Sequence, residues 1–145
     1  MSDERSLDLL IVTFGLSNGR TIEGRTRIQK LICNLQYGIK IPLGFDFRSY
    51  YYGPYSDDLA ELISDLVDLK ILDEEPVEFE YGRTRYDYKL TKEGFQLFEK
   101  TVRKLQKVDN NLLEKLRRAM IKLNNVPTPF LIDMAKEASH MESTA

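Results

Sequence analysis

The sequence predicts a mostly α-helical protein with a small antiparallel β-sheet, and two patterns carry this prediction. Apolar residues recur at i, i+3, i+4 and i+7 in several segments, which is the spacing of one face of an α-helix. Elsewhere apolar and polar residues alternate on both sides of a glycine, which is typical of a β-hairpin. The chain has 145 residues, of which 42% are hydrophobic and 30% are charged. This size and composition favour one soluble globular unit with a substantial core.

Six helices are expected, and capping residues or glycine and proline breaks set their limits. The first is expected to hold an apolar stripe from Leu7 to Phe14 and to stop at Asn18-Gly19. The others are expected from Arg25 or Thr26 to about Gly38, from Ser56 to residue 70, after Thr91, from Asp109 or Asn110, and after Pro129. Ser56 and Thr91 are suitable N-cap residues because a hydroxyl oxygen can accept from a free amide of the first helical turn.

Residues 39 to 55 are expected to be non-helical and to contain a strand. Phe45, Phe47 and Tyr51 alternate there with polar residues, which is the period of a strand. A turn at Gly53-Pro54-Tyr55 is then expected to lead into the third helix. The aromatic residues of this segment are expected either to pack the strand into the core or to face a partner.

Residues 71 to 90 are expected to form a β-hairpin. A two-residue turn at its central glycine would place Phe79 opposite Tyr86 and Val77 opposite Tyr88. A loop two residues longer would keep the same side chains on one face, because side-chain orientation repeats every two residues. The pattern therefore predicts which side chains share a face and leaves the loop length open.

The order of these elements is helix, helix, strand, helix, hairpin, helix. A helical trio followed by a hairpin is the winged helix-turn-helix pattern, in which the hairpin is the wing and residues 56 to 70 take the place of the recognition helix. We therefore expect a winged-helix domain over residues 1–93 and a helical extension over residues 94–140. Residues 141–145 are expected to form a disordered tail.

Two local motifs resemble known families. The run Tyr88-Lys89-Leu90-Thr91-Lys92-Glu93-Gly94 resembles the "LT-x-x-G" step by which winged-helix regulators leave the wing and begin the next helix. The run Gly24-Arg25-Thr26-Arg27-Ile28-Gln29-Lys30-Leu31, followed by Tyr50-Tyr51-Tyr52-Gly53-Pro54-Tyr55-Ser56, resembles the YwgA-type microbial proteins. It is also similar to the Panacea (SocA-like antitoxin) domain, which neutralises toxins through protein contacts. The resemblance covers roughly the first 100 residues and implies a winged-helix fold.

Several classes of function are disfavoured by the composition. A single cysteine, Cys33, excludes a disulfide framework and a cysteine-based zinc site, and it is expected to be a buried small side chain. The single histidine, His140, leaves no set for nucleophilic catalysis, and the scattered glycines form no phosphate-binding loop. We therefore expect no enzyme activity, no cofactor and no metal. The charged N-terminus shows no targeting segment, so a reducing, cytoplasmic location is expected.

The first functional hypothesis is a DNA-binding transcriptional regulator of winged-helix type. Its candidate nucleic-acid contacts are the cations at the start of the second helix and at the wing, namely Arg25, Arg27, Lys30, Arg83 and Arg85. The segment from residue 57 to 80 argues against ordinary docking, because ten acidic residues and one lysine give it a charge of −9. Acidic groups on a recognition helix repel phosphates.

The alternative hypothesis is a non-enzymatic protein-interaction module, antitoxin-like, that uses the acidic helix and the tyrosine-rich turn. Tyrosine is favoured at interfaces because it combines an apolar ring with a polar tip. The candidate partner-binding residues are Tyr50, Tyr52, Tyr55, Asp58, Glu61 and Asp65. A solvated acidic face with no partner is the other interpretation, and a divalent-metal site is a weaker one.

The last helices are expected to form a homodimer contact. The apolar stripe of the fifth helix includes Leu113, Leu116, Met120 and Leu123, which is more than a lone terminal helix can cover. Two-fold symmetric pairs are the commonest oligomers. The alternative is that these side chains fold back on the winged-helix core.

Overall fold

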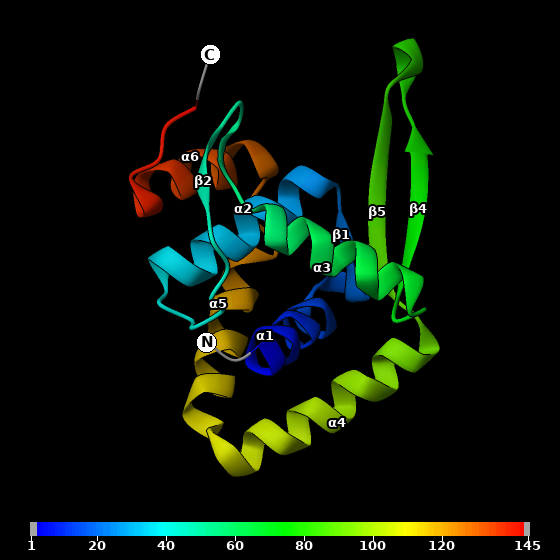
Figure 1. Cartoon of the computed structure of the whole chain (residues 1–145), viewed down its shortest axis with the longest axis vertical. Coiled ribbons are helices and arrows are strands. Elements are labelled where there is room, and N and C mark those ends of the chain that lie inside the picture. The colour runs from blue at the N-terminus through cyan, green and yellow to red at the C-terminus, as the bar shows by residue number, and fades with distance from the viewer. Residues whose placement is uncertain (1–2, 144–145) are drawn as a thin grey trace.

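A computed structural model describes residues 3–143 as a mostly helical protein with small antiparallel sheets (Figure 1). The helices are α1 (Asp3–Leu16), α2 (Arg25–Cys33), α3 (Asp57–Asp68), α4 (Lys92–Val108), α5 (Asn110–Leu123) and α6 (Thr128–Ser139). The strands are β1 (Thr21–Glu23), β2 (Arg48–Tyr50), β3 (Gly53–Tyr55), β4 (Leu72–Glu78) and β5 (Thr84–Leu90). Short helical turns are η1 (Asn18–Arg20), η2 (Asn34–Gly38) and η3 (Glu80–Gly82). The predicted mixture of helices and a small antiparallel sheet is confirmed.

The helices begin where capping side chains pair the free amides of their first turn. Ser56 Oγ accepts from Leu59 N at 3.2 Å at the start of α3, and Thr91 Oγ1 accepts from Gly94 N at 2.9 Å at the start of α4. Asp109 caps α5 in the same way, through the amide of residue 112 at 3.1 Å. These are the caps that the sequence predicts, and each leaves one amide fewer without a partner.

The main sheet has three antiparallel strands in the order β1-β5-β4. Strand β1 is not among the elements that the sequence predicts, since Ile22 is its only apolar residue. Only Ile22 of its three residues is buried, and it pairs with Tyr88 of β5. A single buried residue has no periodicity, so this strand exists through its neighbour and not through its own pattern.

The facing of side chains in the β4–β5 hairpin differs from the prediction. Val77 pairs with Arg85, and Tyr88 pairs with Glu74, so the expected pairs are displaced by an odd number of residues. The reason is the loop, in which Phe79 N donates to Arg83 O at 2.7 Å and three residues remain between them. A loop with an odd number of residues exchanges the faces that a two-residue turn would match.

The segment before α3 is only partly strand. Phe45 and Phe47 are buried, as the alternation predicts, but they lie in an irregular segment, and β2 begins only at Arg48. The side-chain amide of Gln36 replaces a strand partner there. It donates to Phe45 O at 2.7 Å and accepts from Phe45 N at 2.9 Å.

One hydrophobic core joins the first and last parts of the chain. Five apolar residues of α1 are fully buried, and α5 and α6 add further side chains to the same cluster. The four residues predicted for the dimer contact, Leu113, Leu116, Met120 and Leu123, are buried in this core. This corrects the prediction, because side chains covered by their own chain cannot cover a second copy. The expectation of a homodimer stays a prediction without these residues.

The C-terminal part ends in a short irregular segment. Residues 141–143 have no regular secondary structure, and the rest of the predicted tail, residues 144–145, lies outside the described residues. Among the helices of residues 3–143, none combines the length and apolar character that a membrane crossing needs.

We predict that Gly94→Ala destabilises the protein by about 1–3 kcal/mol, the usual cost of forcing an extra methyl group into a packed site. A Cβ atom at Gly94 would overlap the carbonyl oxygen of Ile71 and lie 3.1 Å from Leu90 Cδ2. Urea unfolding followed by circular dichroism measures the change. The control is Glu93→Ala in the same helical turn, where the side chain is exposed. Equal stabilities of the two variants would contradict the packing argument.

Candidate partner-binding surface

Arg27, one of the cations predicted to contact nucleic acid, is directed into the protein. Its Nη1 donates to Val126 O at 2.7 Å and to Thr128 Oγ1 at 3.2 Å. Its Nη2 donates to Leu123 O at 3.1 Å and to Asn124 O at 3.2 Å. Burial lowers the pKa of Arg27. These contacts tie the end of α5 to α2 and engage four of the five donor positions of Arg27, so only Nε remains for a phosphate or another anion.

Lys30 is also part of the interior. Lys30 is only 2% exposed, and its Nζ donates to Pro54 O at 2.6 Å. Burial lowers the pKa of Lys30 to about 8. The predicted role as a phosphate contact is therefore corrected, because the ammonium group is covered by the chain and cannot reach a nucleic acid.

The two sequence segments that carry the YwgA-type resemblance contact each other. Gln29 Nε2 donates to Ser56 O at 2.9 Å, and Gln29 Oε1 accepts from Ser56 N at 2.8 Å. Beside this pair, the bond from Lys30 to Pro54 holds the preceding turn. The polar residues of α2 therefore fix β3 and the start of α3. Sequence reasoning missed this role, and the joint occurrence of the two segments was the signal that could have indicated it.

Arg25 is exposed but is engaged with the β4–β5 hairpin. Its Nε donates to Tyr88 Oη at 2.8 Å, and its guanidinium carbon lies 4.1 Å from the centre of the Tyr86 ring. Tyr88 Oη donates to Glu74 Oε2 at 2.6 Å, and Arg25 Nη2 lies 3.4 Å from the same oxygen. The hydrogen bond to Tyr88 raises the pKa of Arg25. Burial raises the pKa of Tyr88 to about 12.

The two arginines of the hairpin differ from each other. Arg85 donates to both carboxylate oxygens of Asp87, at 2.7 and 2.9 Å, and lies 3.4 Å from Glu23. The hydrogen bond to Asp87 raises the pKa of Arg85. Arg83 is exposed beside the loop, and its side chain has no hydrogen bond or ion pair in the described part of the chain. Of the five predicted cations, Arg83 is therefore the one whose donors are all available.

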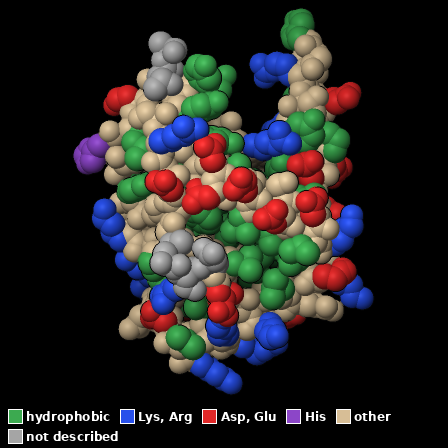
Figure 2. Space-filling model, viewed as in Figure 1, with side chains coloured by type: hydrophobic (Ala, Val, Ile, Leu, Met, Phe, Trp, Pro, Cys, Tyr) green, Lys and Arg blue, Asp and Glu red, His purple; other side chains and the backbone are tan. Residues whose placement is uncertain are grey.

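The outer face of α3 is acidic. Leu59, Ile63 and Leu66 are buried on its inner side, and its acidic residues Asp57, Asp58, Glu61, Asp65 and Asp68 are exposed. No lysine or arginine occurs in the helix. Figure 2 shows these acidic side chains as a row across the front of the molecule, over α3. This helix presents a band of negative charge where a nucleic-acid-binding helix would present donors.

The acidic side chains of α3 are not equivalent. Asp57 pairs with Arg48 at 2.7 Å, and Asp58 accepts from the Ser56 hydroxyl and from Asp46 N at 3.3 Å. These two carboxylates stabilise the start of the helix, where its dipole is positive. The remaining acidic residues of α3, namely Glu61, Asp65 and Asp68, make no side-chain hydrogen bond or ion pair with residues 3–143. They are the carboxylates available to a partner.

Tyrosines crowd the turn between β2 and β3. Tyr50, Tyr51 and Tyr52 are 41%, 60% and 69% exposed, and Tyr55 is half-buried. The ring of Tyr50 lies 4.9 Å from that of Tyr51 and 5.3 Å from that of Tyr55, centre to centre. The Tyr50 ring therefore packs against those of Tyr51 and Tyr55, while Tyr51 and Tyr52 stay mostly exposed. The expected packing of the tyrosines into the core applies to Tyr55 only in part.

We call the free acidic residues of α3, together with Tyr50, Tyr51 and Tyr52, the candidate partner-binding surface. The chain matches no protein-family model, no curated protein and no solved structure. The resemblance to the YwgA-type and Panacea proteins therefore stays a prediction. Any function must be argued from the contacts and charges of this chain.

Neither a metal site nor a reactive thiol is found in the described part of the chain. No group of three histidine, cysteine, aspartate or glutamate side chains within residues 3–143 is placed to hold a metal ion. Cys33 is buried, and burial raises the pKa of its thiol to about 11. A thiol held in its protonated form is a weak nucleophile.

We predict that Lys30→Met removes a component of stability that grows with pH. The folded pKa of about 8 lies below the ordinary value of 10.5. Between these values the unfolded chain holds more protons, so the free energy of unfolding rises with pH. The free energy of unfolding of wild type, relative to that of Lys30→Met, should therefore increase from about pH 8 to about pH 10. Urea unfolding at several pH values measures both proteins, and parallel curves would contradict a buried ammonium group.

Proposed function

We propose that this chain is a winged-helix protein-interaction module whose partner presents a basic surface. The element order α1-β1-α2-β2-β3-α3-β4-β5, the strand order β1-β5-β4 and the long hairpin after α3 support the winged-helix assignment. The observation that carries the function is the set of unpaired carboxylates on α3, and exposed tyrosines at the hairpin turns accompany it. A protein surface rich in lysine or arginine complements that charge.

The tyrosines add the apolar part of such an interface. Both hairpins, β2–β3 and β4–β5, point toward the same end of the molecule in Figure 1. Each carries tyrosine at its turn, Tyr51 and Tyr52 in one and Tyr81 in the other, and Tyr81 is 96% exposed. Exposed tyrosines are common at the centre of protein interfaces, where burial of the ring contributes most of the affinity. The acidic helix supplies attraction and orientation.

DNA binding is the second candidate, and the unpaired Arg83 favours it. This arginine lies beside the exposed Tyr81, at the end of the hairpin where winged proteins reach DNA. The contacts of Arg27 and Lys30 inside the chain weigh against it, because they leave fewer of the five predicted cations to neutralise phosphates. The acidic face of α3 adds repulsion.

We predict that the triple variant Glu61→Gln, Asp65→Asn, Asp68→Asn weakens partner capture about tenfold. Three charge contacts at about 0.5 kcal/mol each sum to about 1.5 kcal/mol, which is a tenfold change in affinity. Cross-linking in the host extract with quantitative mass spectrometry compares the variant with wild type. The control is Glu93→Gln, Glu99→Gln, Asp133→Asn, which removes three exposed carboxylates from α4 and α6. Equal loss in both variants, or no loss in either, would count against the acidic surface.

We further predict no binding to mixed-sequence duplex DNA at about 50 mM salt. Fluorescence anisotropy measures it, with a repeat at about 200 mM salt, where counterion release weakens any DNA complex. The matched variant is Arg83→Glu, which reverses the charge of the free arginine beside the hairpin loop. Binding that falls steeply with salt and disappears in Arg83→Glu would replace the protein-interaction proposal by DNA recognition.

A further inference from the structure

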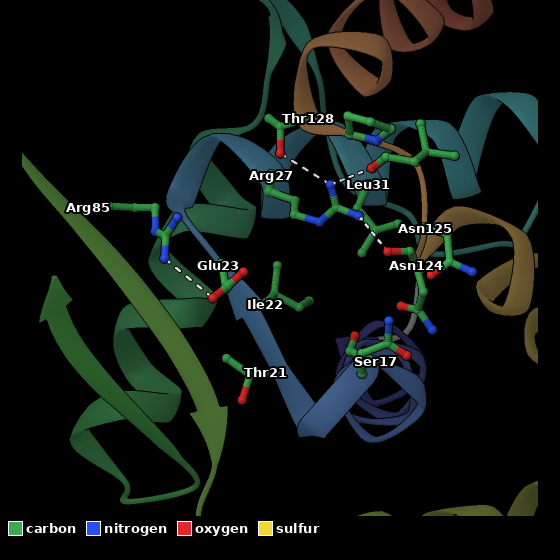
Figure 3. Close-up of a pocket in the computed structure, with 13 residues that line it drawn as sticks. Ser17, Thr21, Ile22, Glu23, Arg27, Leu31, Arg85, Asn124, Asn125 and Thr128 are labelled. Atoms are coloured by element: carbon green, nitrogen blue, oxygen red, sulfur yellow. Dashed lines mark hydrogen bonds and ion pairs between the residues drawn. The ribbon is translucent and has the colours of Figure 1, made fainter. Parts of the chain in front are cut away.

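A polar cavity lies behind the β4–β5 hairpin, away from the candidate partner-binding surface. It has a volume of about 560 Å³ and is enclosed by the start of α2, strand β1, strand β5 and the link between α5 and α6 (Figure 3). A second hollow of about 460 Å³ shares Glu23, Arg27, Arg85 and Thr128 with it. Volumes of this size are typical of small-molecule sites.

Both signs of charge are present on the wall of this cavity. Figure 3 shows Arg85 and Glu23 on one side, and Arg27 with Asn124 on the other. Neutral hydrogen-bonding side chains fill much of the remaining wall, namely Ser17, Asn18, Thr21, Asn125 and Thr128. A cavity with two guanidinium groups, one carboxylate and several amides and hydroxyls suits a small polar ligand that itself carries both charges.

We propose that this cavity binds a free α-amino acid with a polar side chain, with its carboxylate on Arg27 and its ammonium group on Glu23. An α-amino acid carries both charged groups on one carbon atom. Arg27 and Glu23 both line the cavity. The Glu23 carboxylate opposes the fall in the pKa of Arg27, so the two charges lie near enough for one ligand to meet both. This binding goes beyond the proposed partner recognition and does not depend on it.

Arg27 retains one donor for a ligand carboxylate. All acceptors bound by Arg27 are uncharged, so no carboxylate of residues 3–143 forms an ion pair with it. Its Nε donates to no acceptor in that part of the chain. Its four bonds to the end of α5 and to Thr128 fix the guanidinium group before a ligand arrives. Asp87 holds Arg85 through Nε and Nη2, so Arg85 keeps an ion-pair partner when Glu23 turns toward a ligand.

The Glu23 side chain is held only weakly by Arg85. Its contact with Arg85 is longer than the two bonds from Arg85 to Asp87, and its side chain is 63% exposed. An exposed ion pair of this kind contributes little to stability. The ligand can therefore separate Glu23 from Arg85 at small cost and replace one ion pair by two.

The experiment titrates the isotopically labelled full chain with L-glutamine and follows backbone amide shifts at constant ionic strength. The amide side chain of glutamine matches the exposed amides of Asn18 and Asn125. Saturable shifts at up to about 10 mM ligand are expected, confined to the residues that line the cavity, near 17–31, 85 and 124–128. N-acetyl-L-glutamine lacks the ammonium group and L-glutaminamide lacks the carboxylate. Both should bind at least about tenfold more weakly.

Glu23→Gln provides the sharper test, because it should weaken L-glutamine binding about threefold to fivefold through loss of the ammonium contact. The control is Glu99→Gln, an exposed carboxylate on α4, which should bind as wild type. Thermal unfolding checks that both variants are folded. Equal binding of N-acetyl-L-glutamine, or tighter binding by Glu23→Gln, would show an anion site and overturn the amino-acid proposal. Absence of saturable shifts, or shifts elsewhere, would overturn the cavity itself.

Discussion

Hydrogen bonds from the polar side chains of α2 to backbone groups of other elements hold the structure together. Gln29 and Lys30 bind the backbone of β3 and the start of α3, and Arg27 binds the end of α5. Just beyond the helix, Asn34 Nδ2 donates to Leu131 O of α6 at 3.1 Å. Buried backbone groups must find partners, because an unpaired one costs about 1–3 kcal/mol. Each contact therefore fixes one segment at a defined place, and a nine-residue helix positions both the candidate partner-binding surface and the walls of the polar cavity.

Because Arg27 and Lys30 bind uncharged oxygens inside the protein, they do not offset the acidic residues on its surface. Their acceptors are carbonyl and hydroxyl oxygens. The acidic residues of α3 keep their negative charge without a nearby base on the same helix. The chain has 21 lysine and arginine residues against 23 acidic residues, so the negative band on α3 reflects where the charges lie more than an excess of acids. A partner of opposite charge is then attracted to one face only, which favours a defined orientation.

Most of the fold could be predicted from the sequence, because its helices and hairpin follow local rules. Long amphipathic stripes and N-caps such as Ser56 act within one or two turns, so their pattern is visible in the sequence. Strand β1 and the hairpin register were missed, since one depends on pairing with β5 and the other on a loop with Tyr81 at positive φ. The site was predicted less well. Arg27 and Lys30 have the charge and position of DNA contacts, and only the fold shows that they face inward. The acidic face of α3 follows directly from helical spacing, so that part of the site was accessible.

The loop of the β4–β5 hairpin carries a conformational cost that the chain itself does not offset. Tyr81 has a φ of 65°, a left-handed conformation that costs about 1–2 kcal/mol for a residue with a side chain. Glycine would avoid this cost, and the neighbouring Gly82 shows the same kind of φ, 70°. A buried ring could repay the strain through packing, but the Tyr81 ring is almost fully exposed. Strain held at an exposed aromatic residue supports a role outside the chain. Burial of that ring against a partner would offset the cost. In the proposed interaction, the loop would then form a second contact in addition to the tyrosines of β2–β3.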